Sequence, residues 1–232
     1  MQNHYAVNIK RESKPSSSFR VSCVRNEFDY QNTIVQENIT GVLEIPAEWS
    51  IGCIVGGSGT GKTTILNDIF PDTIVSLPTE RADSVIDDMP DGASVKDIEM
   101  MFTSIGFSSV PSWLKPYRVL SNGEKMRADL AYTLLSANDG DIVSFDEFTS
   151  VVDRDVAKNL SVSLQKTVRR TGKRFIAVTC HRDVLDWLQP DWCFDTDKGG
   201  MVDPKCSSPQ RGISLSDAVG VKNGEILADI II

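Results

Sequence analysis

The sequence predicts an α/β fold in which helices flank a mostly parallel central sheet. Apolar runs typical of buried strands alternate with helix-like runs, as at Ile51–Val55, Asp141–Phe145 and Arg174–Cys180. This alternation favours parallel strands that are joined by right-handed crossovers. A glycine-rich turn follows the first of these runs, and an acidic pair follows the second. With 232 residues, the chain is long enough for one substantial core.

The glycine-rich turn fits the pattern G-x-x-x-x-G-K-[ST], which is typical of a phosphate-binding P-loop. It consists of Gly56, Gly57, Ser58, Gly59, Thr60, Gly61, Lys62 and Thr63, and a helix-like run starts at Thr64. Glycines let backbone N–H groups turn inward around phosphates, and the N-terminus of the next helix adds positive potential. We expect Lys62 to reach the β- and γ-phosphates and Thr63 to bind Mg²⁺. The alternative is a glycine-rich turn that binds no ligand.

The acidic pair is delivered by the apolar run Ile142–Phe145, which ends in Asp146 and Glu147. Downstream of a P-loop, a carboxylate at the end of a strand is placed to hold Mg²⁺, directly or through water. We therefore expect Asp146 to be a metal ligand and Glu147 to polarise the attacking water. The alternative is that the two acids belong to an ordinary turn.

Composition restricts the class of protein. The net charge is −8, and no apolar run approaches the ~20 residues that a membrane-spanning helix needs. The N-terminus lacks the basic-then-apolar pattern of a signal peptide. We therefore predict a soluble, cytoplasmic protein with no membrane partner. The acidic balance also argues against a broad nucleic-acid-binding surface.

Two residue groups are interpreted as structural. Five scattered cysteines without a C-x-x-C pair argue against a disulfide framework or a zinc ribbon, and we expect Cys53 and Cys180 to be buried. Only two histidines are present, which excludes a histidine-rich metal site. The basic residues between Lys166 and Arg174 fit the C-terminus of a predicted helix, with a partner-binding patch as the alternative.

The predicted organisation has a flexible leader at 1–18, a nucleotide-binding domain at 19–197 and a C-terminal extension at 198–232. Within the domain, 19–50 forms a small antiparallel β subdomain and 78–137 a shortened helical subdomain. The expected strands are Phe19–Val24, Thr33–Gln36, Gly41–Ile45, Thr73–Leu77 and, within the extension, Glu225–Ile232. The expected helices are Ser94–Ser104, Lys125–Ser136, Arg154–Arg170 and Arg182–Leu188. Capping boxes start at Ser94 and Ser121.

The run Leu120-Ser121-Asn122-Gly123-Glu124 resembles the signature motif of ABC-type ATPases, usually written L-S-G-G-Q. The order of the motifs is also similar to that family: P-loop, signature, acidic strand, the loop that holds Asp153, and His181. The resemblance implies that Ser121 and Gly123 face the γ-phosphate of ATP bound to a second subunit. An ordinary capping box with no partner phosphate is the alternative.

The resemblance implies further site residues. Ser150–Asp153 is similar to the D-loop, which crosses the dimer interface, so Asp153 is expected at the nucleotide of the pair. His181 is similar to the switch histidine that contacts the γ-phosphate and the attacking water. Thr64, next to the P-loop, is expected to contact the nucleotide as well. Tyr30 is expected to stack on adenine, with Phe28 as the alternative.

Two departures from the family pattern argue against a transporter subunit. No Gln lies between Gln36 and Gln165, where relatives carry one that binds Mg²⁺, and Glu80 and Asp83 are the candidates to replace it. The interval of about 58 residues between the P-loop and the signature is also short for a transporter ATPase.

Three longer stretches narrow the resemblance. They are Trp113–Lys125, Phe145–Arg154 and Val178–Leu188, and they are similar to a soluble ABC ATPase group of microbes and phages. Members of that group are often fused to a GNAT-type acetyltransferase domain. We expect no such domain here, because little chain follows Asp197.

The resemblance implies an ATPase with ATP and Mg²⁺ as cofactors and with Glu147, His181 and Lys62 as catalytic residues. It implies a homodimer that pairs head to tail around two ATP·Mg²⁺ and acts with a nucleic acid or a partner enzyme. One alternative is an ATP-gated accessory or scaffold subunit for a separate enzyme such as an acetyltransferase. The other is the ATPase subunit of a membrane transporter.

Overall fold

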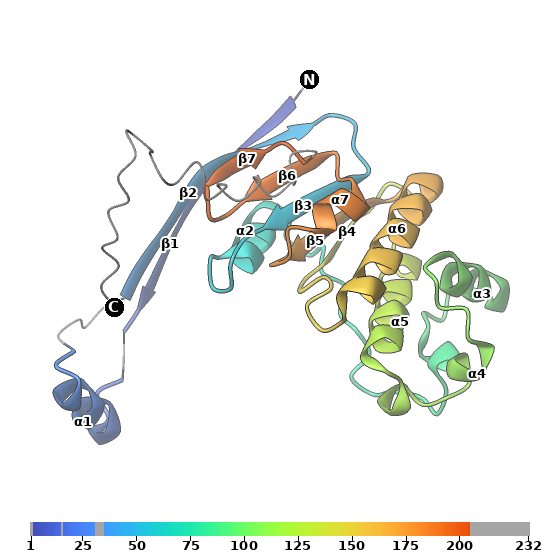
Figure 1. The fold of residues 1–232 in the computed structure, drawn as a ribbon, viewed down its shortest axis with the longest axis horizontal. Coiled ribbons are helices and arrows are strands. Elements are labelled where there is room, and N and C mark those ends of the chain that lie inside the picture. Colours follow the sequence, from blue (N-terminus) through green and yellow to red (C-terminus); the bar gives the residue numbers. More distant parts are fainter. Residues whose placement is uncertain (1, 15, 31–34, 205–232) are drawn as a thin grey trace, which may run out of the picture.

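A five-stranded sheet forms the centre of the protein in the computed structural model, which describes residues 2–14, 16–30 and 35–204 (Figure 1). The strand order is β4-β5-β3-β6-β7. The strands are β3 (Ile51–Val55), β4 (Ile142–Phe145), β5 (Arg174–Thr179), β6 (Trp192–Asp195) and β7 (Gly200–Val202). The first four are parallel, and only the edge strand β7 runs antiparallel, to β6. The predicted α/β fold with a mostly parallel sheet is therefore confirmed.

Strand β3 is buried along its whole length because both faces of the sheet are covered. Ile51, Cys53 and Val55 pack in the core that also contains α5 (Asn122–Leu135) and α6 (Arg154–Thr171). Ile54 faces the opposite core, which contains α2 (Lys62–Ile69) and the N-terminal hairpin. The period of two along the strand thus places alternate side chains in two separate cores.

The N-terminal hairpin pairs β1 (Gln2–Ser13) with β2 (Val35–Pro46) over twelve residues each. The expectation of a loose leader is therefore wrong for Gln2–Ser13. The hydrogen-bond partners of this segment come from a strand more than twenty residues away, which local composition does not reveal. The expected strand Gly41–Ile45 is confirmed within β2, whereas Thr33 lies outside the described residues.

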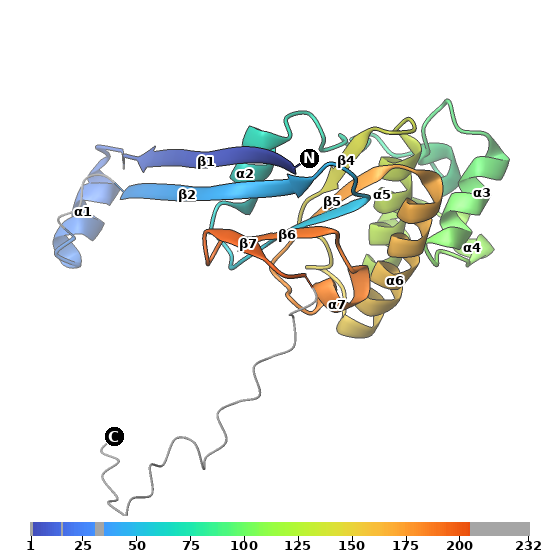
Figure 2. The same ribbon diagram turned by 90° about the horizontal axis from the view of Figure 1, so that it is seen from above.

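The expected strand Phe19–Val24 is also wrong, because Phe19–Glu27 forms helix α1. Ser18 starts this helix by accepting a hydrogen bond from the Val21 N–H at 3.3 Å. Among the described residues no strand pairs with this segment, and the Ser18 cap favours the helix. None of the α1 residues is buried. Figures 1 and 2 show α1 at the far end of the hairpin.

The shortened helical subdomain consists of η1 (Val85–Asp88), α3 (Val95–Ser104), α4 (Val110–Trp113) and η2 (Tyr117–Val119), which lead into α5. Both predicted capping boxes are present, at Ser94 with Asp97 and at Ser121 with Glu124. The expected strand Thr73–Leu77 is reduced to a single bridge between Ile74 and Ser144, because the chain leaves the sheet there for the helical subdomain.

The second half of the domain follows the prediction closely. Asp153 caps α6 by accepting a hydrogen bond from the Val156 N–H at 2.9 Å, and Gly172 ends the helix in a left-handed conformation. The next helix, α7 (Val184–Leu188), starts two residues later than expected. Cys53 is buried as expected, but Cys180 is exposed because it lies just beyond the end of β5.

The boundaries of the domain and of the C-terminal extension stay predictions, and the expected strand Glu225–Ile232 lies outside the described residues. Within the described ranges, none of the helices combines the length and the hydrophobicity needed to cross a bilayer.

Candidate functional site

The P-loop follows β3 and requires glycine at two positions. A Cβ on Gly56 would lie 1.9 Å from Thr196 Oγ1, so the loop passes too close to the end of β6 for any side chain. Gly61 has a φ of +87°, and a Cβ there would lie 2.0 Å from Ile39 Cδ1. Together these contacts hold the loop between β6 and the hairpin and let α2 start at Lys62.

Lys62 and Thr63 connect the loop to its surroundings. Lys62 is buried, and its Nζ donates a hydrogen bond to the Gly57 carbonyl at 2.6 Å, which folds the side chain back over the loop. Thr63 Oγ1 lies 2.7 Å from Asp146 Oδ2, which comes from the end of β4. A hydroxyl and a carboxylate oxygen are suitable ligands for Mg²⁺. The structure thus brings the two residues predicted to bind metal into direct contact.

Thr64 provides a test of whether this place fits a nucleotide. Among the described residues, its Oγ1 is buried and has no hydrogen-bond partner. Leaving a buried hydroxyl unpaired costs about 1–3 kcal/mol, so such groups usually have a partner. Thr64 lies in the first turn of α2, where unpaired backbone N–H groups favour an anion. These residues therefore fit a polyphosphate with its Mg²⁺.

The predicted catalytic pair lies at the same edge of the sheet. Glu147 is exposed and has a left-handed backbone (φ +52°), and its N–H donates to Asp146 Oδ1 at 2.8 Å. His181 follows β5 and is half-buried, and its N–H donates to Thr179 Oγ1 at 3.1 Å. Because β4, β5 and β3 are parallel neighbours, their carboxyl ends place both residues beside the P-loop.

The end of β6 supplies a contact that the sequence analysis missed. The Gly57 N–H donates to both carboxylate oxygens of Asp197, at 3.1 and 3.0 Å. Arg182, which follows His181, donates to Asp197 Oδ2 at 2.7 Å and forms a second ion pair with Asp195. The signal in the sequence is the pair Asp195 and Asp197 after the apolar run Trp192–Phe194. The expected domain ends at residue 197, so these acids were interpreted as its boundary.

Asp195 is held as a carboxylate in a buried position. Burial by itself favours the protonated form, but the hydrogen bonds and charge of Arg182 outweigh it and lower the pKa of Asp195. The N–H groups of Asp197 and Lys198 also donate to its Oδ1. This network holds Asp197, which accepts the hydrogen bond from Gly57. It also connects Asp197 to Arg182, the residue next to His181.

The signature turn is held rigidly and is exposed at its tip. Ser121 Oγ accepts from the Glu124 N–H at 3.3 Å, and Glu124 Oε2 accepts from the Ser121 N–H at 2.9 Å. The hydroxyl of Ser112 donates to Glu124 Oε1 at 2.6 Å and is the main reason why the pKa of Glu124 is lowered. A Cβ on Gly123 would lie 3.2 Å from Val156 Cγ1, so the tip also packs on the start of α6.

The structure does not bring the signature and the predicted adenine contact to the P-loop of the same chain. Figures 1 and 2 both show α5 apart from α2, and Ser121 and Gly123 belong to the start of α5 whereas Lys62 belongs to the start of α2. Tyr30 lies just after α1 at the far end of the hairpin, as does the alternative Phe28. Ile39 of β2 is the hairpin residue that contacts the loop.

Asp153 lies at the start of α6, where its carboxylate caps the helix. Glu80 and Asp83, the candidates to replace the missing Gln, are both exposed.

Arg81, which lies between Glu80 and Asp83, contacts the signature helix α5, and the sequence did not predict this contact. Its Nη2 lies 3.0 Å from Asp129 Oδ1, and its guanidinium stacks 4.0 Å above the ring centre of Tyr117. The Tyr117 hydroxyl donates to Asp129 Oδ2 at 2.6 Å. Burial raises the pKa of Asp129 against the opposing effect of these partners. The segment after the P-loop helix is thereby tied to the signature helix.

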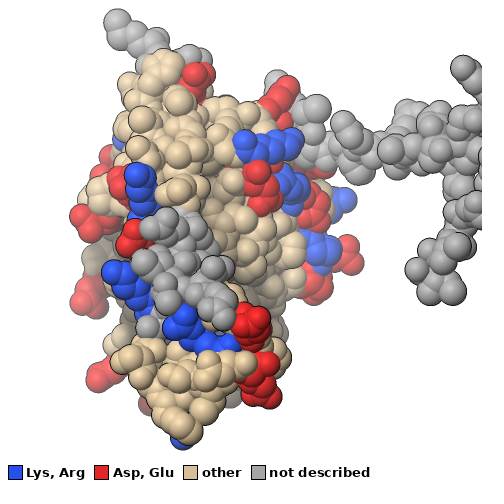
Figure 3. All heavy atoms as spheres, turned by 90° about the vertical axis from the view of Figure 1, so that its left-hand side faces the viewer, with Lys and Arg blue, Asp and Glu red and all other residues tan. Residues whose placement is uncertain are grey.

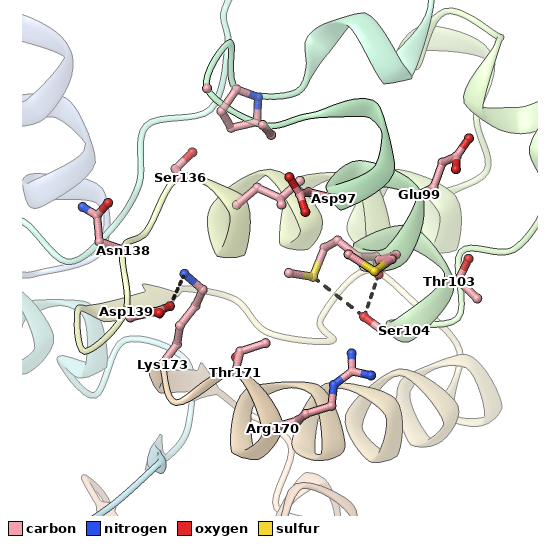
Figure 4. A pocket seen from close by; sticks show the side chains of 16 residues that line it. Asp97, Glu99, Thr103, Ser104, Ser136, Asn138, Asp139, Arg170, Thr171 and Lys173 are labelled. Atoms are coloured by element: carbon pink, nitrogen blue, oxygen red, sulfur yellow. Dashed lines mark hydrogen bonds and ion pairs between the residues drawn. The ribbon is translucent and has the colours of Figure 1, made fainter.

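A cavity of about 1160 Å³ lies elsewhere, between α3 and the C-terminal ends of α5 and α6 (Figure 4). Its lining includes Asp97, Met100, Arg170 and Lys173 but none of the predicted site residues. We place the functional site at the P-loop because the groups that fit phosphate and Mg²⁺ converge there.

Comparison with solved structures shows the fold. A bacterial Atm1-family ABC exporter with ATP bound aligns with 72% of this chain at 20% identity and a TM-score of 0.54, and the match covers 36% of the exporter chain. The ATP-binding cassette MJ0796, in a dimeric post-hydrolysis state with ADP and Pi, aligns over 87% of this chain and 97% of its own, at 16% identity and a TM-score of 0.58.

A second dimeric structure of MJ0796, described as a bacterial ABC transporter cassette, aligns with the same coverage at 14% identity and a TM-score of 0.56. The chain therefore has the fold of an ABC-type ATPase cassette. No protein-family model matches it, and no curated protein matches its sequence. The similarity to the group fused to acetyltransferases stays a prediction.

Proposed function

We propose that the chain is an ABC-type ATPase that binds ATP·Mg²⁺ at the P-loop and hydrolyses it when a second copy closes over the nucleotide. The observation that carries this proposal is the 2.7 Å contact between Thr63 and Asp146 beside the buried Lys62. It joins the P-loop to the acidic strand end across 83 residues of sequence. An ordinary turn or an empty glycine loop would not require that pairing.

Catalysis in this proposal is positional and electrostatic. Lys62 offsets the charge that develops on the transferred phosphoryl group, and Thr63 and Asp146 hold Mg²⁺. Bound Mg²⁺ supplies charge neutralisation between the phosphates. Glu147 accepts a proton from the attacking water, and His181 orients that water from the neighbouring strand. Both side chains leave the carboxyl end of the same sheet as the P-loop.

The second copy provides the other half of the site. The N-terminus of α5 carries exposed backbone N–H groups and a positive end of the helix dipole, which favour a γ-phosphate. Ser121 and Gly123 lie at this tip, and α5 is apart from the P-loop helix α2 of its own chain (Figure 1). Head-to-tail pairing of two chains places each tip over the other nucleotide. Hydrolysis removes the charge that holds the pair together.

We also propose that the protein acts in the cytoplasm as a soluble ATPase and not as a transporter subunit. The short helical subdomain supports this, since four short elements, η1, α3, α4 and η2, separate the P-loop part from the signature helix. The coupled process involves a nucleic acid or a partner enzyme. Stimulation of ATP hydrolysis by DNA or RNA would support the first, and purification with a partner enzyme the second.

The direct test of the proposed activity is phosphate release from ATP by wild type and Glu147→Gln. General acid–base catalysis contributes about 10²–10⁴ to such rates, so the variant should lose at least about 100-fold in turnover while retaining ATP binding. The matched control is Asp139→Asn, the same chemical change at an exposed position outside the site. Equal turnover in Glu147→Gln and wild type would remove Glu147 from the catalytic role.

A further inference from the structure

Arg127 lies on the signature helix α5, one turn after Gly123. Long side chains on a helix point back toward its N-terminus, and residues four positions apart share a face. A Cβ on Gly123 would lie 3.3 Å from Arg127 Nη1, and a Cβ on Gly106 would lie 3.9 Å from Arg127 Nε. The guanidinium therefore extends from the residue that follows α3 to the tip of the signature turn (residues 121–123), with Nη1 against the tip.

Arg127 is a half-buried cation without a partner in the described part of its own chain. Its Nε is buried and has no hydrogen-bond partner there, and the guanidinium forms no ion pair with a described residue. A guanidinium keeps its charge in proteins, and burying a charge costs free energy unless the charge is paired. The side chain therefore carries donors for an anion that the described part of its own chain does not supply.

Two carboxylates, those of Glu124 and Asp153, lie within electrostatic range of Arg127. Burial is the main reason why the pKa of Arg127 is lowered, and these two carboxylates act in the opposite direction. Both are occupied as helix caps, Glu124 on α5 and Asp153 on α6. They would repel a phosphate that approaches the tip, and the charge of Arg127 offsets that repulsion. Arg127 therefore makes the tip more favourable for an anion than the helix N-terminus alone.

The charges at the opposite end of the molecule do not provide a broad attraction between two copies. Figure 3 shows the end that bears α1; among the described residues of this face, Lys and Arg side chains are interspersed with Asp and Glu, and neither sign forms a broad patch. The whole chain carries a net charge of −8, so two copies repel each other at long range. Electrostatic attraction is then expected from groups beside the nucleotide, where the tip of the signature turn brings Arg127.

We propose that Arg127 is a catalytic residue that acts across the pair: its guanidinium donates hydrogen bonds to the γ-phosphate of the ATP held by the second copy. This inference rests on the proposed head-to-tail dimer, which places the tip of the signature turn over that phosphate. A planar guanidinium can bind two phosphate oxygens at once. It offsets the negative charge on these oxygens during hydrolysis and adds to the charge of Lys62 from the other chain.

The test mixes Arg127→Met with Glu147→Gln, because a head-to-tail pair joins the P-loop of one chain to the signature turn of the other. Arg127→Met alone should lose roughly 10- to 100-fold in turnover, since hydrogen bonds to a charged group stabilise by that much. Glu147→Gln supplies Arg127 but has almost no turnover of its own. An excess of it should raise phosphate release by the Arg127→Met chain roughly tenfold.

The matched control is the double variant Glu147→Gln, Arg127→Met, which supplies a signature turn without the guanidinium and should give no recovery. Recovery with neither chain, or equally with both, would overturn the inference. The molecular mass of Glu147→Gln with ATP·Mg²⁺ separates this outcome from failure of the proposed function: a dimer without recovery refutes only the role of Arg127, whereas absence of a dimer refutes both. Arg127→Gln replaces Arg127→Met in the mixture if the Met chain does not bind ATP.

A comparison of Arg127→Lys with Arg127→Met separates contact with the phosphate from a packing role. Lys keeps the charge, whereas Met keeps only an unbranched apolar side chain, so the Lys variant should retain roughly tenfold more turnover than the Met variant. A packing role would place Met equal to or above Lys, because the ammonium would stay unpaired. Lys125→Met is the control for loss of one cation from α5, since its Nζ lies 5.7 Å from the Tyr117 ring centre. It should leave turnover unchanged, and a loss equal to that of Arg127→Met would contradict the assignment.

Discussion

The P-loop and the signature turn are held in place in two different ways. The P-loop is fixed by contacts between distant segments: Thr63 with Asp146, Gly57 with Asp197, and Gly61 with Ile39. The signature turn is fixed mainly by residues close in sequence, through the capping box of Ser121 and Glu124. The first arrangement builds a binding site within one chain. The second arrangement builds a rigid turn that is exposed at the surface.

This difference teaches how one chain can carry half of each of two sites. The residues that would bind the phosphates and Mg²⁺ at the P-loop are positioned within one chain, so a monomer should bind ATP. The signature half has no ligand within its own chain and gains one only across an interface. Substitutions in the two halves should therefore separate nucleotide binding from pairing, and the following predictions test that separation.

The largest effect is expected from Ser121→Arg. A long cation at the exposed tip blocks close approach of the second chain, so ATP-driven pairing should be abolished while ATP binding by the monomer is retained. Light scattering measures pairing and fluorescent-nucleotide titration measures binding. Ser94→Arg is the matched control, because it removes the same kind of capping box from α3 and should spare pairing. Loss of ATP binding in Ser121→Arg would contradict the separation of the two halves.

A smaller effect is expected from Lys62→Ala, which removes the buried ammonium group of the P-loop lysine. Hydrogen bonds to charged groups are worth about 1.5–3 kcal/mol, so ATP affinity of the monomer should fall roughly 10- to 100-fold. Isothermal titration of the monomeric Ser121→Arg background measures this loss without interference from pairing. An unchanged affinity would show that Lys62 does not reach the phosphates.

The Asp195–Arg182 pair predicts a dependence of stability on pH. The pKa of Asp195 is lowered in the folded state, so the stabilisation is fully present above its unfolded pKa of about 3.9 and is lost as the pH falls through the lower folded value. Asp195→Asn should cost about 1–2 kcal/mol in unfolding free energy at pH 7, and this difference should shrink below about pH 4. Urea unfolding at pH 7 and pH 3 measures it; a constant difference would contradict the assignment.

The smallest effect is expected from Asp197→Asn. The amide keeps one oxygen that can accept from the Gly57 N–H. It removes the negative charge of Asp197 that pairs with Arg182, so the P-loop should be positioned less firmly. We expect the ATP affinity to change by only about threefold, equivalent to about 0.6 kcal/mol. The same change at Asp203, outside the P-loop, is the control. A loss as large as that of Lys62→Ala would show that Asp197 does more than orient Gly57.

The features predicted from sequence are those that a short run of residues specifies. Both capping boxes and the Asp153 cap on α6 depend on residues a few positions apart, and the P-loop is recognised from one short motif although distant contacts hold it in place. All four have the expected backbone structure. The parallel sheet followed from alternating strands and helices. The roles of the site residues in binding and hydrolysis stay predictions, although Thr63 and Asp146 are already in contact.

The features that were missed depend on non-local pairing. Gln2–Ser13 forms a strand by pairing with β2, whereas Phe19–Glu27 pairs with no strand in the described part of the chain and forms a helix capped by Ser18. Asp197 reaches Gly57 because β6 is the neighbour of β3, which the order of motifs does not specify. Arg81 was overlooked because its partner Asp129 lies in the signature helix, 48 residues away.

The most direct test of the two-chain site is the molecular mass of Glu147→Gln before and after addition of ATP·Mg²⁺. The account predicts that this 25.5 kDa chain is a monomer without nucleotide, becomes a dimer with ATP·Mg²⁺, and remains a monomer with ADP. A chain that binds ATP tightly at the P-loop and yet keeps the monomer mass at every protein concentration would contradict it.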